Sequence, residues 1–124
     1  MRGLDTNVLV AWILGASDDK RALEGGPFRV SFVALVELVW VFGKVYKQSR
    51  AEIEAIIATL LQTEGIHFEN DEIVIQSLRD FGNGSADFAD YLLMHDGAFA
   101  GCETTLTFDK RAARHPGFTL LTGG

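Results

Sequence analysis

The chain has 124 residues, of which 48% are hydrophobic and 23% charged, and this composition is typical of one globular domain rather than of a disordered or fibrous protein. Its formal net charge of −6 argues, taken alone, against a nucleic-acid binder, because such proteins usually carry a basic patch. Asp5 or Glu37 interrupts the longest apolar runs, so none reaches the ~20 residues that a membrane-spanning helix needs.

Short strands alternate with helices along the chain. In chain order, the patterns predict a strand over 2–5 and a buried helix after it, a strand over 28–32, an apolar helix over about 32–47, an amphipathic helix from Ser49 to about 63, a strand over 66–68 and a helix after it, a helix from Ser85 to about Gly101, a strand over 104–108 and a short strand over 118–121. This alternation predicts an α/β fold with a parallel sheet covered on both faces, in one domain over residues 1–124.

The N-terminal segment and the cysteine count indicate the compartment. Residues 1–15 combine a charge with an apolar stretch, but Asp5 and Asn7 interrupt it and no small-residue cleavage site is evident. We therefore expect folded structure there and a cytoplasmic protein. The single cysteine, Cys102, excludes an internal disulfide and a cysteine-based zinc site, and we expect it to be a buried small side chain.

Four acids lie near the edge where ligands bind to a sheet of this kind, at the carboxyl ends of its strands. Asp5 and Asp109 directly follow predicted strands, and Glu37 and Asp90 lie one to two turns into predicted helices. We expect the four carboxylates to converge. Because like charges at short distance repel, such a cluster stays ionised mainly when cations lie among the oxygens. Oxygen ligands without His or Cys suit Mg²⁺ or Mn²⁺ rather than zinc.

Glu37 is the acid that local structure explains least. It lies inside the run FVALVELVWVF, residues 32–42, which we expect to be fully buried, and an ionised carboxylate in an apolar interior is costly unless a counter-charge or hydrogen bonds compensate it. Local roles are open for two of the other acids. Asp5 could cap the helix that follows it, and Asp109 could be a turn residue.

The stretch SADFADYLL contains two acids with different predicted roles. With Ser85 as N-cap, Asp87 falls in the first helical turn, where the helix dipole favours a negative charge by ~0.3–1 kcal/mol. Asp90 would lie deeper in the helix, where aspartate is a poor helix former. We therefore predict Asp90 as a primary metal ligand, and Asp87, on the same helix face, as an accessory ligand.

Four motifs together resemble the PIN-domain family: LDTNVLV with Asp5, VALVELVWV with Glu37, SADFADYLL with Asp90, and LTFDK with Asp109. Within that family the chain is most similar to the VapC-type ribonuclease toxins of bacterial toxin–antitoxin pairs. The resemblance implies a three-layer α/β/α sandwich with a central parallel sheet, Mg²⁺- or Mn²⁺-dependent endoribonuclease activity, a homodimer, and a small antitoxin as partner. It places Asp5, Glu37, Asp90 and Asp109 on the family's acidic positions and implies that nearby polar side chains support them: Thr6, Asn7 and Thr107. The stretch His95-Asp96-Gly97 departs from the small apolar residues usual in relatives.

On this interpretation the acids hold one or two ions that orient a water for in-line attack on an RNA phosphate. The bound cations neutralise the acidic cluster, so the negative net charge is no longer an objection. Local basic clusters would hold flanking RNA: Lys44, Lys47, Arg50, Lys110 and Arg111. No histidine is needed, and we interpret all three as structural or solvated: His67, His95 and His115.

Two other functions fit the same residues. The chain could be a non-catalytic protein-binding module of the same fold, acting through its apolar helices. It could also be a phosphohydrolase with Asp5 as nucleophile, but such an enzyme needs a second acid two residues on, and Asn7 occupies that position. The sequence does not indicate which RNA would be cut, because specificity depends on surface shape and loop contacts.

Overall fold

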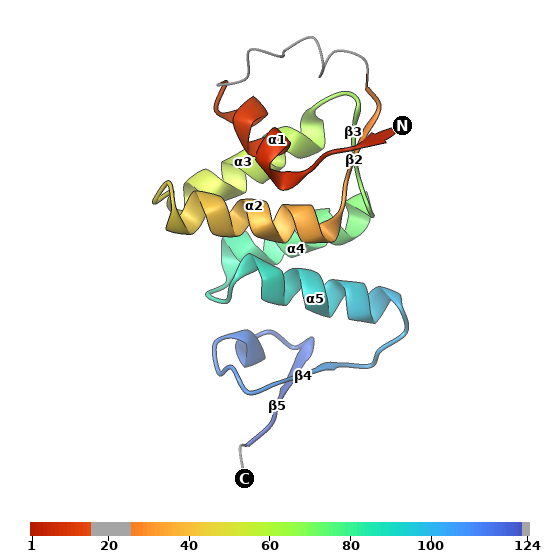
Figure 1. Ribbon diagram of the computed structural model, residues 1–124. Coiled ribbons are helices and arrows are strands. Elements are labelled where there is room, and N and C mark those ends of the chain that lie inside the picture. Colours follow the sequence, from red (N-terminus) through yellow and green to blue (C-terminus); the bar gives the residue numbers. More distant parts are fainter. Residues whose placement is uncertain (16–25, 123–124) are drawn as a thin grey trace. The chain divides into compact units, whose positions relative to one another are not determined.

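The computed structural model describes residues 1–15 and 26–122, and the chain divides into two compact units, Met1–Asp71 and Glu72–Gly124 (Figure 1). Every strand pair of the described residues is parallel, and each unit has its own sheet. The α/β class predicted from the sequence is confirmed, and the helices and parallel strands are consistent with the three-layer α/β/α arrangement. Within the described ranges, no helix is long and apolar enough to cross a membrane.

Unit 1 has a three-stranded sheet in the order β1-β2-β3, in which Arg2 lies opposite Phe28 and Phe28 opposite Ile66. Its elements are, in chain order, β1 (Arg2–Gly3), α1 (Thr6–Ile13), β2 (Phe28–Val30), α2 (Phe32–Lys44), α3 (Arg50–Gln62) and β3 (Ile66–Phe68). These are the elements that the sequence predicts, and several end a few residues earlier than expected.

Helix α2 is amphipathic rather than buried on all sides, which corrects the expectation for residues 32–42. Leu38 and Phe42 are almost fully buried, whereas Val33 and Trp40 are 70% and 60% exposed. Glu37 is also exposed, and it shares a face with Val33 and Trp40 because positions i, i+4 and i+7 coincide on a helix. The unbroken apolar run did not indicate burial, because apolar side chains occupy the outer face of α2 as well as its inner face.

Helix α3 begins where its capping residues predict. Ser49 Oγ accepts from the Glu52 backbone N–H at 3.1 Å, and Glu52 Oε1 accepts from the Ser49 backbone N–H at 3.2 Å. This reciprocal pair is a capping box, which satisfies two backbone donors at the helix start. Ile53 and Ile57, four residues apart, lie on the buried face of the helix.

Unit 2 has a two-stranded sheet in which Thr105 lies opposite Phe118. Its elements are α4 (Asp71–Asn83), which begins at the last residue of unit 1, α5 (Phe88–Phe99), β4 (Thr105–Thr107), the short 3₁₀ helix η1 (Ala112–Arg114) and β5 (Phe118–Leu120). Its core includes an edge-to-face pair of Phe81 and Phe88, with ring centroids 5.8 Å apart.

Helix α5 begins two residues later than the sequence suggests. Asp87 rather than Ser85 is the N-cap, with extended backbone angles φ −72° and ψ 151°, and Asp90 lies in the first helical turn. Asp90 Oδ2 accepts a hydrogen bond from the Asp87 backbone N–H at 3.3 Å. Asp90 therefore has a local capping role that we did not expect. The other end agrees with the sequence, because Gly101 follows the last turn with φ +100°, a conformation that favours glycine.

Cys102 is exposed, which corrects the expectation that it is buried. It follows Gly101 in the turn after α5, outside the helix face that packs into the core. Burial of cysteine is a tendency of the residue type, and the position in a surface turn overrides it here.

Candidate functional site

Asp5 lies at the carboxyl end of β1 and is the N-cap of α1. Its backbone occupies the capping position, but its side chain makes no capping hydrogen bond and is exposed. Capping therefore does not account for the carboxylate of Asp5. Its oxygens face solvent, where they can meet a ligand.

A hydrogen bond links α1 to Glu37. The buried Thr6 hydroxyl donates to Glu37 Oε2 at 2.9 Å. Because Thr6 directly follows Asp5, this bond fixes the Glu37 side chain relative to the segment that carries Asp5. Asn7, the third polar residue of this segment, is exposed on α1. The charge of Glu37 is therefore compensated by solvent exposure and by the hydrogen bond from the Thr6 hydroxyl.

In unit 2, Asp90 lies within electrostatic range of two further carboxylates. Burial raises the pKa of the Asp90 carboxyl above its ordinary value, and the hydrogen bond from the Asp87 backbone lowers it. Repulsion by the Asp87 and Asp109 carboxylates raises this pKa further, and Arg111 offsets part of the effect. Asp90 and Asp109 are half-buried, whereas Asp87 is exposed. Negative charge is therefore concentrated around Asp90.

Asp109 is held in a tight turn after β4. Its backbone N–H donates to Thr107 Oγ1 at 3.0 Å, and its Oδ1 accepts from the Arg111 backbone N–H at 2.8 Å. The Arg111 Nε atom lies 3.7 Å from the same oxygen. The turn role considered from the sequence is therefore real. It engages one carboxylate oxygen and fixes the orientation of the other.

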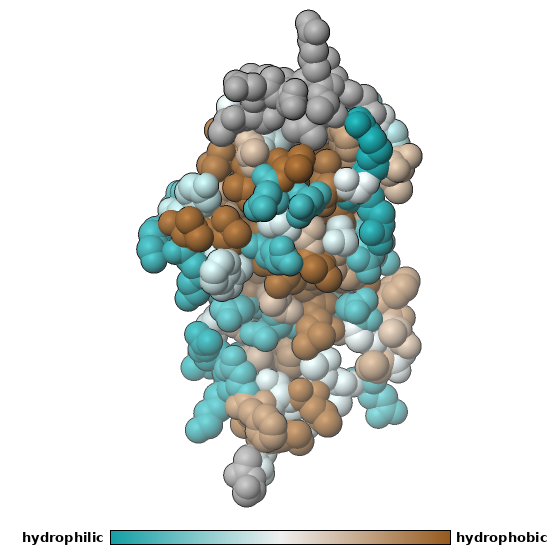
Figure 2. All heavy atoms as spheres, viewed as in Figure 1, coloured by the Kyte–Doolittle hydropathy of each residue, from teal (hydrophilic) through white to brown (hydrophobic). Residues whose placement is uncertain are grey.

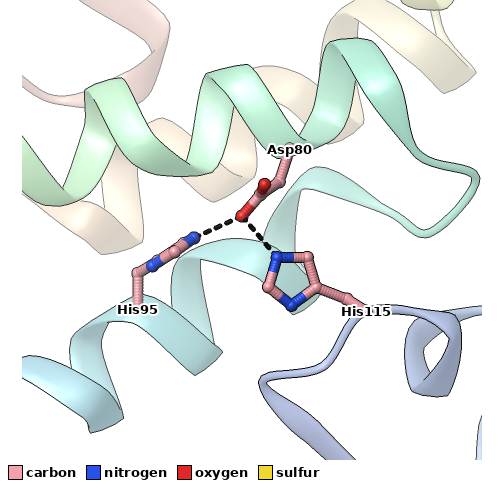
Figure 3. Close-up of side chains that lie close together, drawn as sticks. All are labelled: Asp80, His95 and His115. Carbon is pink, nitrogen blue, oxygen red and sulfur yellow. Dashed lines mark hydrogen bonds and ion pairs between the residues drawn. The ribbon is translucent and has the colours of Figure 1, made fainter.

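A second cluster, which the sequence interpretation missed, joins Asp80 of α4, His95 of α5 and His115, the residue after η1 (Figure 3). Both rings point toward Asp80 Oδ2, with His95 Nε2 at 2.5 Å and His115 Nε2 at 3.0 Å. One ligand atom from each residue lies within 4.8 Å of the others, so the group could hold a metal ion. The three residues are 15 or more positions apart in the sequence, so no local sequence motif predicts their contact.

The state of His115 follows from its other ring nitrogen. His115 Nδ1 accepts from the Gly117 backbone N–H at 2.9 Å. A neutral imidazole that accepts at Nδ1 carries its proton on Nε2, and that N–H donates to Asp80. In this tautomer the cluster is a hydrogen-bonded network. In it His95 and His115 both contact Asp80, while His67 is exposed on β3.

The model of one protein family covers almost the whole chain: the PIN domain model matches residues 4–117. The chain belongs to the PIN-domain family. No curated protein and no solved structure matches it. PIN domains have a nuclease-type fold, are generally hydrolases and usually use divalent metal ions.

The predicted ligands of this PIN protein have the donor chemistry that a divalent ion of the magnesium type prefers. Asp5, Glu37, Asp87, Asp90 and Asp109 all lie within the matched residues and offer only carboxylate oxygens, which hard cations prefer. Burial is the largest cause of the raised pKa of Asp90, and the repulsion that Asp87 and Asp109 add to it is a second sign, because a cation would relieve that repulsion.

Asp90→Asn should leave the metal-free PIN protein as stable as the unsubstituted chain at pH 7, or more stable. A raised pKa means that the folded state binds the Asp90 proton more tightly than the unfolded state, so the ionised carboxylate opposes folding at neutral pH. The advantage of the variant should shrink as the pH falls through the pKa of folded Asp90. Asn can still accept from the Asp87 backbone N–H.

Denaturant unfolding in chelator at several pH values measures the stability of Asp90→Asn relative to the unsubstituted chain, with the exposed Asp96→Asn on the same helix as control. A variant clearly less stable at pH 7 would mean that capping by the charged form dominates.

Proposed function

We propose that this PIN protein is a metal-dependent endoribonuclease that cleaves RNA phosphodiester bonds. In this proposal Asp5, Glu37, Asp90 and Asp109 hold Mg²⁺ or Mn²⁺, and Asp87 is an accessory ligand. The observation that carries the proposal is the repulsion that the Asp87 and Asp109 carboxylates exert on half-buried Asp90, since a bound cation would relieve repulsion of this kind. Membership of a family of nucleases supports the reaction class.

The bound ion would supply Lewis-acid stabilisation of phosphate charge and a more acidic water. The chain's own residues orient the carboxylates. The Thr6 hydroxyl holds Glu37, and the Asp87 backbone N–H holds Asp90. The backbone N–H of Arg111 holds Asp109. Ligands fixed in this way need little reorganisation when a cation binds. Exposed basic side chains would bind the flanking RNA: Lys44, Lys47, Arg50, Lys110 and Arg111.

The proposal requires the acids of both units to act together as parts of one PIN domain over residues 1–124. Asp5 and Glu37 belong to unit 1, and Asp87, Asp90 and Asp109 belong to unit 2. Support comes from the family match, which runs through both units, and from the order of the four acidic motifs.

Thr6→Val should lower RNA cleavage about 3- to 10-fold, because it removes the donor that holds Glu37. That range corresponds to ~1 kcal/mol, the usual net contribution of one hydrogen bond. Thr6→Ser keeps a hydroxyl and should retain most of the activity. Steady-state cleavage of one RNA by the two variants measures the difference. Full activity of Thr6→Val together with a loss in Thr6→Ser would show that the methyl group of Thr6 matters and the hydrogen bond does not.

We further propose that the protein is a VapC-like toxin of a type II toxin–antitoxin pair, acting in the cytoplasm as a homodimer that a cognate antitoxin neutralises. Exposed apolar side chains in both units support an interface, since such surface usually marks one (Figure 2). The most exposed of them include Val33, Trp40, Phe99 and Phe108. A monomer in light scattering at high concentration, together with no binding partner encoded by a neighbouring reading frame, would contradict this role.

The exposed apolar surface also favours the alternative of a non-catalytic protein-binding module. Calorimetric titration of Mn²⁺ into the metal-free chain separates the two functions. The proposed enzyme should bind the ion saturably, and Glu37→Gln should weaken the binding, while Glu64→Gln, an exposed acid outside the site, should not. A chain that binds no ion in this titration would be the module. If the ion binds as expected, sequencing the 5′ ends of RNA after induced expression would identify the cleaved sites.

A further inference from the structure

A pocket of about 450 Å³, whose lining includes charged and polar side chains, lies within unit 2 and is not lined by Asp87, Asp90 or Asp109. Its volume falls within the range of small-ligand sites. One wall is formed by Gly84 and Ser85, which precede α5, and another by the segment from Arg111 to Pro116. The first wall is held in place locally: Tyr91 Oη accepts from the Ala86 backbone N–H at 3.2 Å, and a Cβ at Gly84 would clash with that oxygen.

Two arginines give the pocket positive charge. Arg114 Nη1 donates to Ser85 Oγ at 3.4 Å, and among the described residues no carboxylate lies within 4.0 Å of its guanidinium. Arg111 also lines the pocket and reaches toward Asp109, with 3.7 Å between Arg111 Nε and Asp109 Oδ1. A guanidinium without an acidic partner beside a hydroxyl is suited to an anion with several oxygens, because its donors match phosphate geometry.

Among the residues that the structure describes, Asp80 is the one acid that lines this pocket, and its charge is engaged by two histidines. Asp80 Oδ2 accepts from His95 Nε2 and His115 Nε2, which both point toward it (Figure 3). Two ring N–H donors on one oxygen disperse the negative charge of the carboxylate and orient it toward the rings. The groups that determine which ion enters are therefore Arg111 and Arg114.

We propose that this pocket binds a phosphate group of a nucleic-acid strand, with Arg114 and Arg111 as charged donors and Ser85 as a neutral one. The nucleic-acid identity of the ligand rests on the proposed function, whereas the phosphate chemistry rests on the pocket itself. Because Arg111 lies between the pocket and Asp109, the bound phosphate is one that flanks the bond to be cleaved. The pocket thereby sets the register of the strand.

Titration of inorganic phosphate into the full chain in the presence of a chelator tests the pocket without any cleavage. Saturable binding, followed by amide and arginine Nε–H shifts in NMR spectra, is expected for the unsubstituted chain. Arg114→Ala should weaken it at least about tenfold, as the loss of a charge-assisted contact implies. Arg79→Ala, which removes an equal charge from the exposed side of α4 outside the pocket, should change the affinity less than twofold. No saturable binding, or equal losses in both variants, would overturn the proposal.

Short RNA strands with and without a 5′-phosphate then identify the source of the phosphate. Tighter binding of the phosphorylated strand that depends on Arg114 assigns a terminal phosphate, and equal binding that depends on Arg114 assigns an internal phosphodiester. Strand binding that Arg114→Ala leaves unchanged would overturn the nucleic-acid assignment. Phosphate binding by a chain that cleaves no RNA would contradict the proposed function but would support phosphate binding by the pocket.

Discussion

Asp90→Asn is expected to lower the rate of RNA cleavage by at least ~100-fold while the protein remains folded. Mutation of groups that only hold a metal ligand in place typically costs ~10–100-fold, so loss of a ligand itself should cost no less. Asn keeps the shape of Asp and can accept the same hydrogen bond from the Asp87 backbone, so α5 should begin at the same residue. Single-turnover cleavage of one RNA at saturating Mg²⁺ measures the effect.

Asp87→Asn provides the comparison within the same helix. Asn is as good an N-cap as Asp, and Asp87 is exposed, so we expect a modest loss of cleavage and a weaker affinity for the metal. The ranking of the two acids now rests on the half-burial of Asp90 rather than on a deeper position in the helix, which the structure corrects. A larger loss for Asp87→Asn than for Asp90→Asn would make Asp87 the primary ligand.

Glu37→Gln should also lower cleavage by at least ~100-fold and leave the free energy of unfolding nearly unchanged. The amide oxygen of Gln can accept from the Thr6 hydroxyl, and the side chain is exposed, so neither packing nor solvation changes much. Glu64→Gln serves as the matched exposed control and should cleave normally. If Glu37→Gln unfolds the chain, the residue is structural. If it cleaves as fast as the control, Glu37 is not a ligand.

The sequence predicts the order and type of nearly all elements, because local signals determine them. Ser49 and Glu52 form the capping box that marks the start of α3, and the β-branched run around Thr105 forms β4. The start of α5 was misplaced because Ser85 and Asp87 are both good N-cap residues, and local preference does not decide between them.

Features that depend on the tertiary environment were harder to predict. The exposure of Glu37 depends on which face of α2 packs against the core. An unbroken apolar run does not show which face that is. The contact of Asp80 with His95 and His115 joins three separate elements, so no spacing rule could show it. The acids at the ends of β1 and β4 could be named as candidates because strand ends are visible in the sequence.

The most direct test of the account is RNA cleavage by the purified chain with Mg²⁺, with a chelator, and with Mg²⁺ restored in excess of the chelator. Asp90→Asn, prepared in the same way, controls for contaminating nucleases. We predict cleavage with Mg²⁺, none in chelator, recovery when Mg²⁺ is restored, and little cleavage by the variant throughout. Full cleavage in chelator, or equal cleavage by the variant, would contradict a metal-dependent site built on these carboxylates.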